Sequence, residues 1–353
     1  PFARSVPDTR GSWFDSRPSI PRRHGVRGRM PRRPHARGSQ WSFLAGGLAR
    51  RILLCTNRAW DTAGRLASAY SGKSKASGVE TMSDDARSRY DVFAARREEA
   101  ARSAQGSLAL VNTQWITDEQ QVWPVPGLWA PRGDGGSGLV VRAEAADGIV
   151  VDGELVDGEA TVRGKDDPEP STVRFSETVT GMVISGDQGY ALRVFDQNSD
   201  DATNFSHIDR YDYDPAWQVT ARWEEIPGGA LVGFDHLKDE GHAREEVVSG
   251  NIVWEFEGET YSLSAIKSGT ALQVVFADHT SGPETYSVGR FLFCAPHPDG
   301  TITLDFNYAV LPPCAFSYQY NCPLPPANNR LPFPIRAGEK QVMATSGELL
   351  HPE

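Results

Sequence analysis

Residues 252–265 read IVWEFEGETYSLSA, and the pattern of this stretch decides the fold class. Apolar side chains occupy every second position before and after a turn at 257–260, namely Ile252, Trp254, Phe256, Tyr261, Leu263 and Ala265. A period of two is typical of a β-strand that buries one face. Two such runs joined by a short turn with a glycine predict an antiparallel hairpin.

Similar β-like runs follow this hairpin toward the C-terminus. Residues 272–276, 286–293 and 301–307 continue the series. Proline is then frequent from Leu311 to Pro334, and proline cannot donate to a ladder of strand hydrogen bonds. We therefore predict an antiparallel second β module at 209–345 that ends in a Pro-rich strap.

A first β module is expected upstream, at 105–208. Short apolar runs alternate there with turns such as Asp152-Gly153, which is expected to close a hairpin. The Gly-rich stretch 133–138 lacks the Lys-Ser/Thr of a phosphate-binding loop, so we interpret it as a surface turn. Helical periodicity is almost absent after residue 105, which disfavours parallel βαβ folds. The predicted fold class is mainly β, with two antiparallel modules that are sandwich-like or barrel-like.

One α-helix is expected before the β modules, at 82–104. Ser83 is a good N-cap, and the acidic pair Asp84-Asp85 suits the positive end of a helix. Tyr90 and Phe93 belong to a thin apolar side, and the charged residues that follow form a solvated one. A helix with so narrow an apolar side is expected to pack on the edge of a sheet.

The charge of the chain changes sign at Met82. Residues 1–81 carry 16 Lys or Arg and 4 Asp or Glu, whereas the remaining 272 residues carry 20 and 42. The leader 1–81 is rich in Arg, Pro, Ser and Gly, a composition that favours a disordered segment. Three interpretations of it are open: a translated upstream region with Met82 as the natural start, a basic arm that binds nucleic acid or the acidic body, and an export signal after Arg32-Arg33.

The acidic body contains only four lysines, Lys165, Lys238, Lys267 and Lys340. This composition indicates either a halophilic source or the arginine bias of a GC-rich genome. An acidic surface repels nucleic acid and anionic membranes, so we expect neither as a partner. The four cysteines form no disulfide framework and no apolar run approaches the roughly 18 residues that span a bilayer, so a cytoplasmic location is expected. The sequence identifies no cofactor and no oligomeric state.

The densest run of distinctive motifs lies between Asp278 and Lys340. In chain order these motifs are Asp278-His279-Thr280, Glu284-Thr285-Tyr286, Gly289-Arg290-Phe291-Leu292, Asp305-Phe306-Asn307, Pro312-Pro313-Cys314-Ala315-Phe316, Cys322-Pro323-Leu324-Pro325-Pro326, Asn329-Arg330-Leu331 and Ala337-Gly338-Glu339-Lys340. Through them the chain resembles an uncharacterised prokaryotic family, the domain of unknown function 1684 (DUF1684). The resemblance covers about residues 82–342. It implies a β-rich fold and brings no activity with it.

These motifs suggest a polar cluster beneath the strap. Alternate residues of a strand share a face, so Asp305 and Asn307 are expected to point away from the apolar core. If strands 286–293 and 301–307 pair antiparallel, Arg290 can meet Asp305 or Asn307 across the sheet. The strap would bring four more side chains to this group, Cys314, Cys322, Asn329 and Arg330.

Two interpretations of the cluster are open. In the first it is a pocket for a small anionic or carbonyl-bearing ligand, with Asp305 as the orienting group or base and Cys314 as the nucleophile. The ligand-binding residues would be Arg290, Asn307, Asn329, Arg330 and Tyr286, an arginine holding the anion by paired hydrogen bonds. In the second, Arg290 and Asp305 form a buried ion pair, the asparagines bind strap carbonyls and the cysteines fill space. The protein would then be a non-catalytic interaction or structural protein.

Other constellations are weaker. Cys314 and Cys322 together with His279 or His297 fit no common zinc spacing, so no metal site is predicted. A disulfide that joins these two cysteines is a further alternative. Three histidines stand isolated among acidic residues and are expected on the solvated surface, namely His207, His236 and His242.

Overall fold

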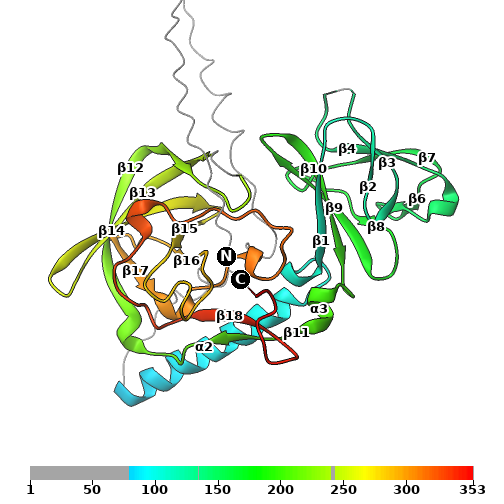
Figure 1. The fold of residues 1–353 in the computed structure, drawn as a ribbon. Helices are drawn as coiled ribbons and strands as arrows, with labels where there is room; N and C mark the ends of the chain where they lie inside the picture. The colour runs from blue at the N-terminus through cyan, green and yellow to red at the C-terminus, as the bar shows by residue number, and fades with distance from the viewer. Residues whose placement is uncertain (1–78, 134, 240–242, 353) are drawn as a thin grey trace, which may run out of the picture. The chain divides into compact units, whose positions relative to one another are not determined.

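The computed structural model describes residues 79–133, 135–239 and 243–352, which are coloured in Figure 1. The predictions for the basic leader as far as residue 78 and for His242 lie outside these residues. Within them the predicted fold class is confirmed, because the described chain is mainly β and its sheets are antiparallel. No helix among the described residues has the length and apolar content needed to cross a membrane.

The predicted N-terminal helix is present as α2, Val79–Ala101. It begins four residues before Ser83, so the prediction of Ser83 as the N-cap is wrong. Phe93 and Ala101 supply its buried apolar side. The helix packs against the two-stranded sheet of β11, Phe205–Arg210, and β18, Glu339–Ala344 (Figure 1).

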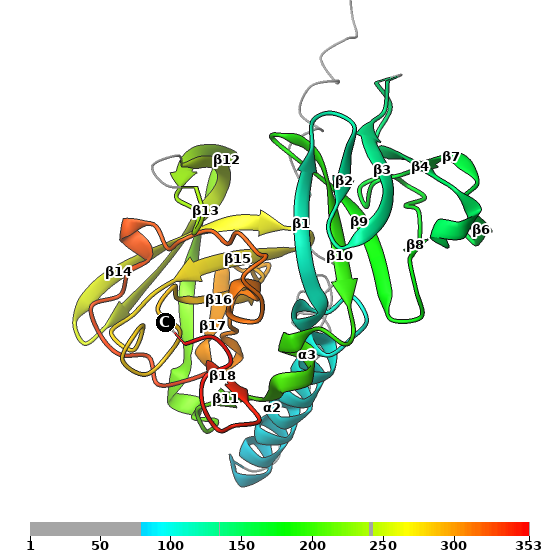
Figure 2. The ribbon, with the colours of Figure 1, turned by 45° about the vertical axis from the view of Figure 1, so that its right-hand side comes forward.

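The first β module consists of two antiparallel sheets. The six-stranded sheet has the order β1 (Leu110–Ile116), β10 (Gly189–Asp196), β9 (Val179–Gly186), β8 (Val173–Arg174), β5 (Val150–Val151) and β6 (Glu154–Leu155). The four-stranded sheet has the order β2 (Gln120–Val122), β3 (Val125–Pro131), β4 (Leu139–Ala143) and β7 (Gly158–Val162). Both views place β2 and β3 beside β1 (Figure 2). Fully buried residues of both sheets, among them Trp129 and Leu192, form one apolar core between them.

The hairpin predicted at Asp152-Gly153 is confirmed. It joins β5 to β6, and both turn residues have positive φ values, 52° for Asp152 and 90° for Gly153. Two consecutive positive φ values are the geometry of the two-residue turn that matches the twist of paired strands.

The second module is built on one six-stranded antiparallel sheet. Its order is β16 (Arg290–Cys294), β15 (Ala271–Phe276), β14 (Glu259–Ser268), β13 (Arg244–Phe256), β12 (Gln218–Phe234) and β17 (Thr301–Asp305). The hairpin predicted from residues 252–265 is the β13–β14 pair, with Trp254 opposite Tyr261. Its turn is Glu257-Gly258, which also has two positive φ values.

The predicted pairing of strand 286–293 with strand 301–307 is wrong. β17 pairs with β12, and β16 pairs with β15. Every residue of β15 and β16 is buried, because one face packs on the interior of the curved sheet and the other on α2, β11, β18 and the strap. Because both faces of these two strands are covered, neither strand has a polar face. The prediction had placed Arg290 on such a face.

The strap contains short 3-10 turns and no long strand. These turns are η5 (Pro313–Ala315) and η6 (Ala327–Asn329), and η4 (Phe306–Tyr308) lies just before the strap. The other short helices are η1 (Ser107–Ala109), η2 (Ala145–Asp147), α3 (Asp200–Asn204) and η3 (Pro215–Trp217). Leu311 and Phe316 enter the apolar cluster beneath α2, and Leu331 and Ile335 enter the interior of the six-stranded sheet. The strap therefore supplies apolar residues to both cores of this module.

Candidate functional site

Arg290 is completely buried and pairs with Asp278, not with the predicted Asp305. The guanidinium Nη2 lies 2.7 Å from the carboxylate Oδ2, and neither side chain is exposed to solvent. The same guanidinium donates to the backbone carbonyls of Ile335, at 2.9 Å, of Ala337 and of Glu339. Asp278 accepts in turn from the backbone N–H of Ile335 at 3.1 Å. The pair therefore links the end of β15 and the start of β16 to residues 335–339, which directly follow the strap.

Asp305 and Asn307 form a separate group. Asp305 Oδ1 accepts from the backbone N–H of Asn307 at 3.1 Å and from its Nδ2 at 2.9 Å. Asn307 exchanges two hydrogen bonds with the backbone of Asp214, at 2.8 and 2.9 Å. Burial raises the pKa of Asp305, and the hydrogen bonds from Asn307 oppose that shift only in part. Asp305 therefore caps η4, and Asn307 fixes the position of the segment that precedes β12.

Asn329 joins the strap to the sheet. Its Nδ2 donates to the carbonyls of Ser264 and Val275, at 2.9 and 2.8 Å, and its Oδ1 accepts from the backbone N–H of Ser264 at 2.8 Å. The side chain is completely buried. The second interpretation expected the asparagines to bind strap carbonyls, but Asn329 lies on the strap and binds carbonyls of the sheet.

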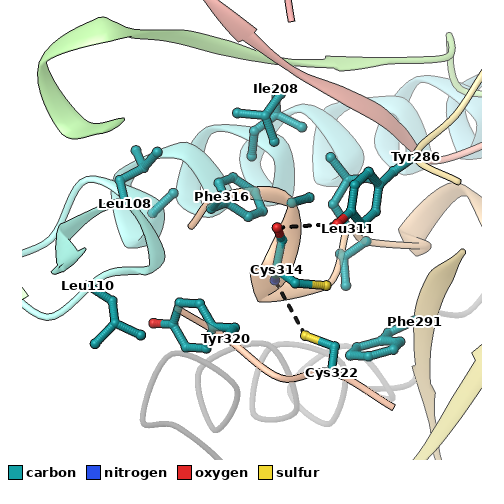
Figure 3. Packing of buried hydrophobic residues seen from close by; sticks show 14 of the residues in the cluster. Leu108, Leu110, Ile208, Tyr286, Phe291, Leu311, Cys314, Phe316, Tyr320 and Cys322 are labelled. Carbon is teal, nitrogen blue, oxygen red and sulfur yellow. Dashed lines mark hydrogen bonds between the residues drawn. The ribbon is translucent and has the colours of Figure 1, made fainter. Parts of the chain in front are cut away.

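Cys314 lies in the apolar cluster under α2, among the residues drawn in Figure 3. Its exposed fraction is 1%, and the Tyr286 hydroxyl donates to its carbonyl oxygen at 3.3 Å. No hydrogen bond among the described residues joins Cys314 to Arg290 or Asp305. The structure thus separates these predicted site residues into four groups: Arg290 with Asp278, Asp305 with Asn307, Asn329 bound to the sheet, and Cys314 with Tyr286 in the apolar cluster.

Arg330 is the predicted ligand-binding residue that faces a cavity. The cavity has a volume of about 390 Å³ and lies between the end of β12 and the strap. Its lining is Gly233, Asp235, Leu324, Pro325, Pro326, Ala327 and Arg330. The two segments are held together by the backbone N–H of Leu324, which donates to the carbonyl of Asp235 at 2.7 Å.

Both ionisable side chains of this cavity are exposed, Arg330 on one segment and Asp235 on the other. Within the described chain neither has a hydrogen-bonded or ion-paired side-chain partner. Gly233 and Asp235 were not predicted as site residues, because they precede Arg330 by more than 90 residues in the sequence. No local pattern indicates that these two segments meet.

A second, larger depression of about 640 Å³ lies on the four-stranded sheet of the first module and is open to solvent. Its arginine, Arg142, is already paired with Glu159 at 2.9 Å and with Glu119. Glu144 and Asp147 add further acidic groups to the lining. The lining of this depression therefore offers an anion no cationic side chain that is free of an acidic partner.

The histidines are distributed differently from the prediction. His236 is buried, and its Nδ1 lies 3.1 Å from the carbonyl oxygen of Phe234, so the prediction that it lies on the solvated surface is wrong. Burial lowers the pKa of His236. His207 is exposed, as expected. In the part of the chain that the structure describes, no three His, Cys, Asp or Glu side chains are grouped to hold a metal ion.

Comparison with known proteins connects the second module to a family. A family model described as "Protein of unknown function (DUF1684)" matches residues 203–340. The solution NMR structure of the uncharacterized protein from gene locus rrnAC0354 of Haloarcula marismortui is 31% identical, with a TM-score of 0.33. That match covers 39% of this chain and 77% of the other. Comparison with curated proteins gives no match.

Proposed function

We propose that this chain, which belongs to the DUF1684 family of proteins of unknown function, binds a small carboxylate-bearing molecule in the cavity beside Arg330. The observation that carries the proposal is an exposed guanidinium on a cavity wall, with no ion pair to neutralise it within the described chain. A carboxylate accepts two parallel N–H bonds from a guanidinium, which gives both affinity and orientation.

The size and walls of the cavity support a small ligand. Its volume of about 390 Å³ lies near the lower end of the roughly 300–1,000 Å³ of small-molecule sites. The lining residues Pro325 and Pro326 have fixed φ angles, so little conformational freedom is lost there on binding.

Asp235 favours a ligand that also carries a positive group. Its carboxylate lines the same cavity as Arg330, and the two sit on different segments of the chain. A purely anionic ligand would be repelled by Asp235, whereas an amine on the ligand would be attracted to it. The ligand class that satisfies both side chains is a zwitterion such as an α-amino acid.

The experiment is a thermal-shift titration with alanine, glutamate, succinate and inorganic phosphate, followed by calorimetry on any compound that stabilises the protein. We expect an amino acid to raise the melting temperature and the Arg330→Ala variant to lose that shift. Arg174→Ala is the matched control, because Arg174 is an exposed arginine outside the cavity. Binding that survives in Arg330→Ala, or the absence of a shift with all four compounds, contradicts the proposal.

The role of Asp235 has its own test. Asp235→Asn removes the negative charge and keeps the size of the side chain. We expect this variant to bind alanine more weakly and succinate more strongly than the unmodified protein does. Unchanged affinity for both compounds would mean that the site binds carboxylates without preferring a zwitterion, and this result would contradict the proposed role of Asp235.

We also propose that the protein works in the cytoplasm of a halophile. The three described cysteines are free thiols, which is typical of a reducing compartment. The scarcity of lysine and the excess of acidic residues support high internal salt. Fractionation of the source cells checks the location, and recovery of the protein from the culture medium contradicts it.

A further inference from the structure

The strap brings two cysteines together inside an apolar cluster. Cys314 begins a turn of the chain at η5, and Cys322 ends it eight residues later. Their exposed fractions are 1% and 4%. Both belong to the cluster that contains Tyr286, Phe291 and Tyr320 (Figure 3).

The geometry places each cysteine within reach of the other. The backbone N–H of Cys314 donates to Cys322 Sγ over 3.4 Å, the contact drawn as a dashed line in Figure 3. Since an N–Cα bond is about 1.46 Å long, that sulfur lies at most about 4.9 Å from the Cα atom of Cys314. A side-chain rotation of Cys314 can bring its own sulfur to the roughly 2.03 Å of a disulfide bond without a large backbone movement.

The two thiols also influence each other. Burial raises the pKa of Cys322 well above its usual value, and a hydrogen bond with the Cys314 side chain raises it further. The Cys322 side chain is therefore a neutral thiol at rest and reacts slowly while the cluster is closed. Cys294 lies in the other core of the module, and among the described residues it has no cysteine hydrogen-bonded to it.

We propose that Cys314 and Cys322 are a reversible dithiol–disulfide pair that peroxide closes, an inference independent of the ligand site. In the first step a thiolate attacks hydrogen peroxide, which forms a sulfenic acid and releases one hydroxide, protonated to water. The second thiol then displaces water from the sulfenic acid and the S–S bond forms. Two thiols lose two electrons and two protons in all, and one peroxide becomes two waters.

The closed pair fixes the turn that connects the strap to the first module. Ser317, inside this turn, donates to the carbonyl of Leu110 at 2.7 Å. The carbonyl of Cys322 accepts from the backbone N–H of Leu237 at 3.0 Å. A cross-link between 314 and 322 closes the turn that carries both attachments into a ring, so oxidation is expected to stabilise the strap against local opening.

The test is mass spectrometry of the full chain after treatment with hydrogen peroxide in the absence of reductant. We expect a loss of about 2 Da, which corresponds to the two hydrogens, and recovery of the original mass with dithiothreitol. Non-reducing peptide mapping should find one linked peptide that contains Cys314 and Cys322. The melting temperature of the oxidised form should be higher than that of the reduced form.

Matched variants separate the pair from the other thiols. Cys294→Ala should still lose about 2 Da, whereas Cys314→Ala and Cys322→Ala should not. If either strap variant fails to fold, the mapping of the unmodified chain decides alone. A disulfide that includes Cys294 or Cys55, or a folded protein in which Cys314 and Cys322 stay free thiols or carry added oxygen after peroxide, overturns the proposal.

Discussion

Arg290 and Asp278 form an ion pair from which solvent is fully excluded, with 2.7 Å between guanidinium Nη2 and carboxylate Oδ2. The pair lies between two strand ends and the strap, and it also satisfies carbonyls at 335, 337 and 339. A buried charge that loses its partner has no water to replace it. The pair is therefore a structural element that the fold requires.

Arg290→Met should destabilise the protein by about 3–5 kcal/mol, because methionine fills part of the space but leaves the Asp278 carboxylate buried and unpaired. Urea unfolding measures the loss. Arg222→Ala is the control, since Arg222 and Glu224 form an exposed pair at 2.6 Å, and its effect should be much smaller. Equal losses for the two variants would contradict the structural role of Arg290.

Asn329 and Arg330 are neighbours in sequence and should differ sharply in their effect on stability. Asn329→Ala removes three hydrogen bonds of a buried side chain and should lower the free energy of unfolding by at least about 2 kcal/mol. Arg330→Ala removes an exposed side chain and should change it by less than about 0.5 kcal/mol. Chemical unfolding of both variants checks the contrast, and a larger loss for Arg330→Ala would be contrary to it.

Asp305 should make stability depend on pH in acid. Its pKa is raised in the folded protein by burial, so the folded state binds its proton more tightly than the unfolded state does. The contribution of this group to stability is therefore fully present below its unfolded pKa and is lost as the pH rises through the folded pKa.

Asp305→Asn cannot ionise, and its amide oxygen can still accept the hydrogen bonds from Asn307. We expect the stability of Asp305→Asn relative to the unmodified protein to increase between pH 4 and pH 7, the range above the usual pKa of about 3.9. Urea unfolding of both proteins at the two pH values measures the change. A difference that stays constant or decreases shows that the carboxylate is not disfavoured by its surroundings.

Salt should stabilise the protein. The formal net charge is −10, and mutual repulsion of the acidic groups falls when the Debye length decreases from about 10 Å at 0.1 M salt to about 3 Å at 1 M. We expect the melting temperature to rise steadily with potassium chloride over this range. A melting curve that does not move removes the support for a halophilic source.

The β13–β14 hairpin and the β17 strand show which features of the fold a local sequence pattern can predict and which it cannot. Alternation in residues 252–265 predicted both strands and the turn, because side chains on one strand alternate between faces whatever the partner. Ile302 and Leu304 alternate with more exposed residues in β17, as predicted. The chain then leaves the strand at Phe306 for a 3-10 turn, and this change buries Asn307 against the expected pattern.

The partner of a strand depends on contacts that no local pattern contains. β17 could have paired with β16, its predecessor in sequence, but it pairs with β12, about 80 residues earlier. The β11–β18 pair, which was not predicted, joins segments about 130 residues apart. Competition among free strand edges decides such pairings, and that competition involves the whole chain.

The sequence alone determined the mainly β fold class, the N-terminal helix and the family of the second module, because periodicity and motif order are properties of neighbouring residues. Only the tertiary structure decided that Arg290 meets Asp278, that Cys314 meets Cys322 and that Asp235 and Arg330 line the same cavity. Each of these pairs depends on how sheet curvature and the strap bring distant segments together, and burial then determines whether a charged or reactive group stabilises the core or remains available to a ligand.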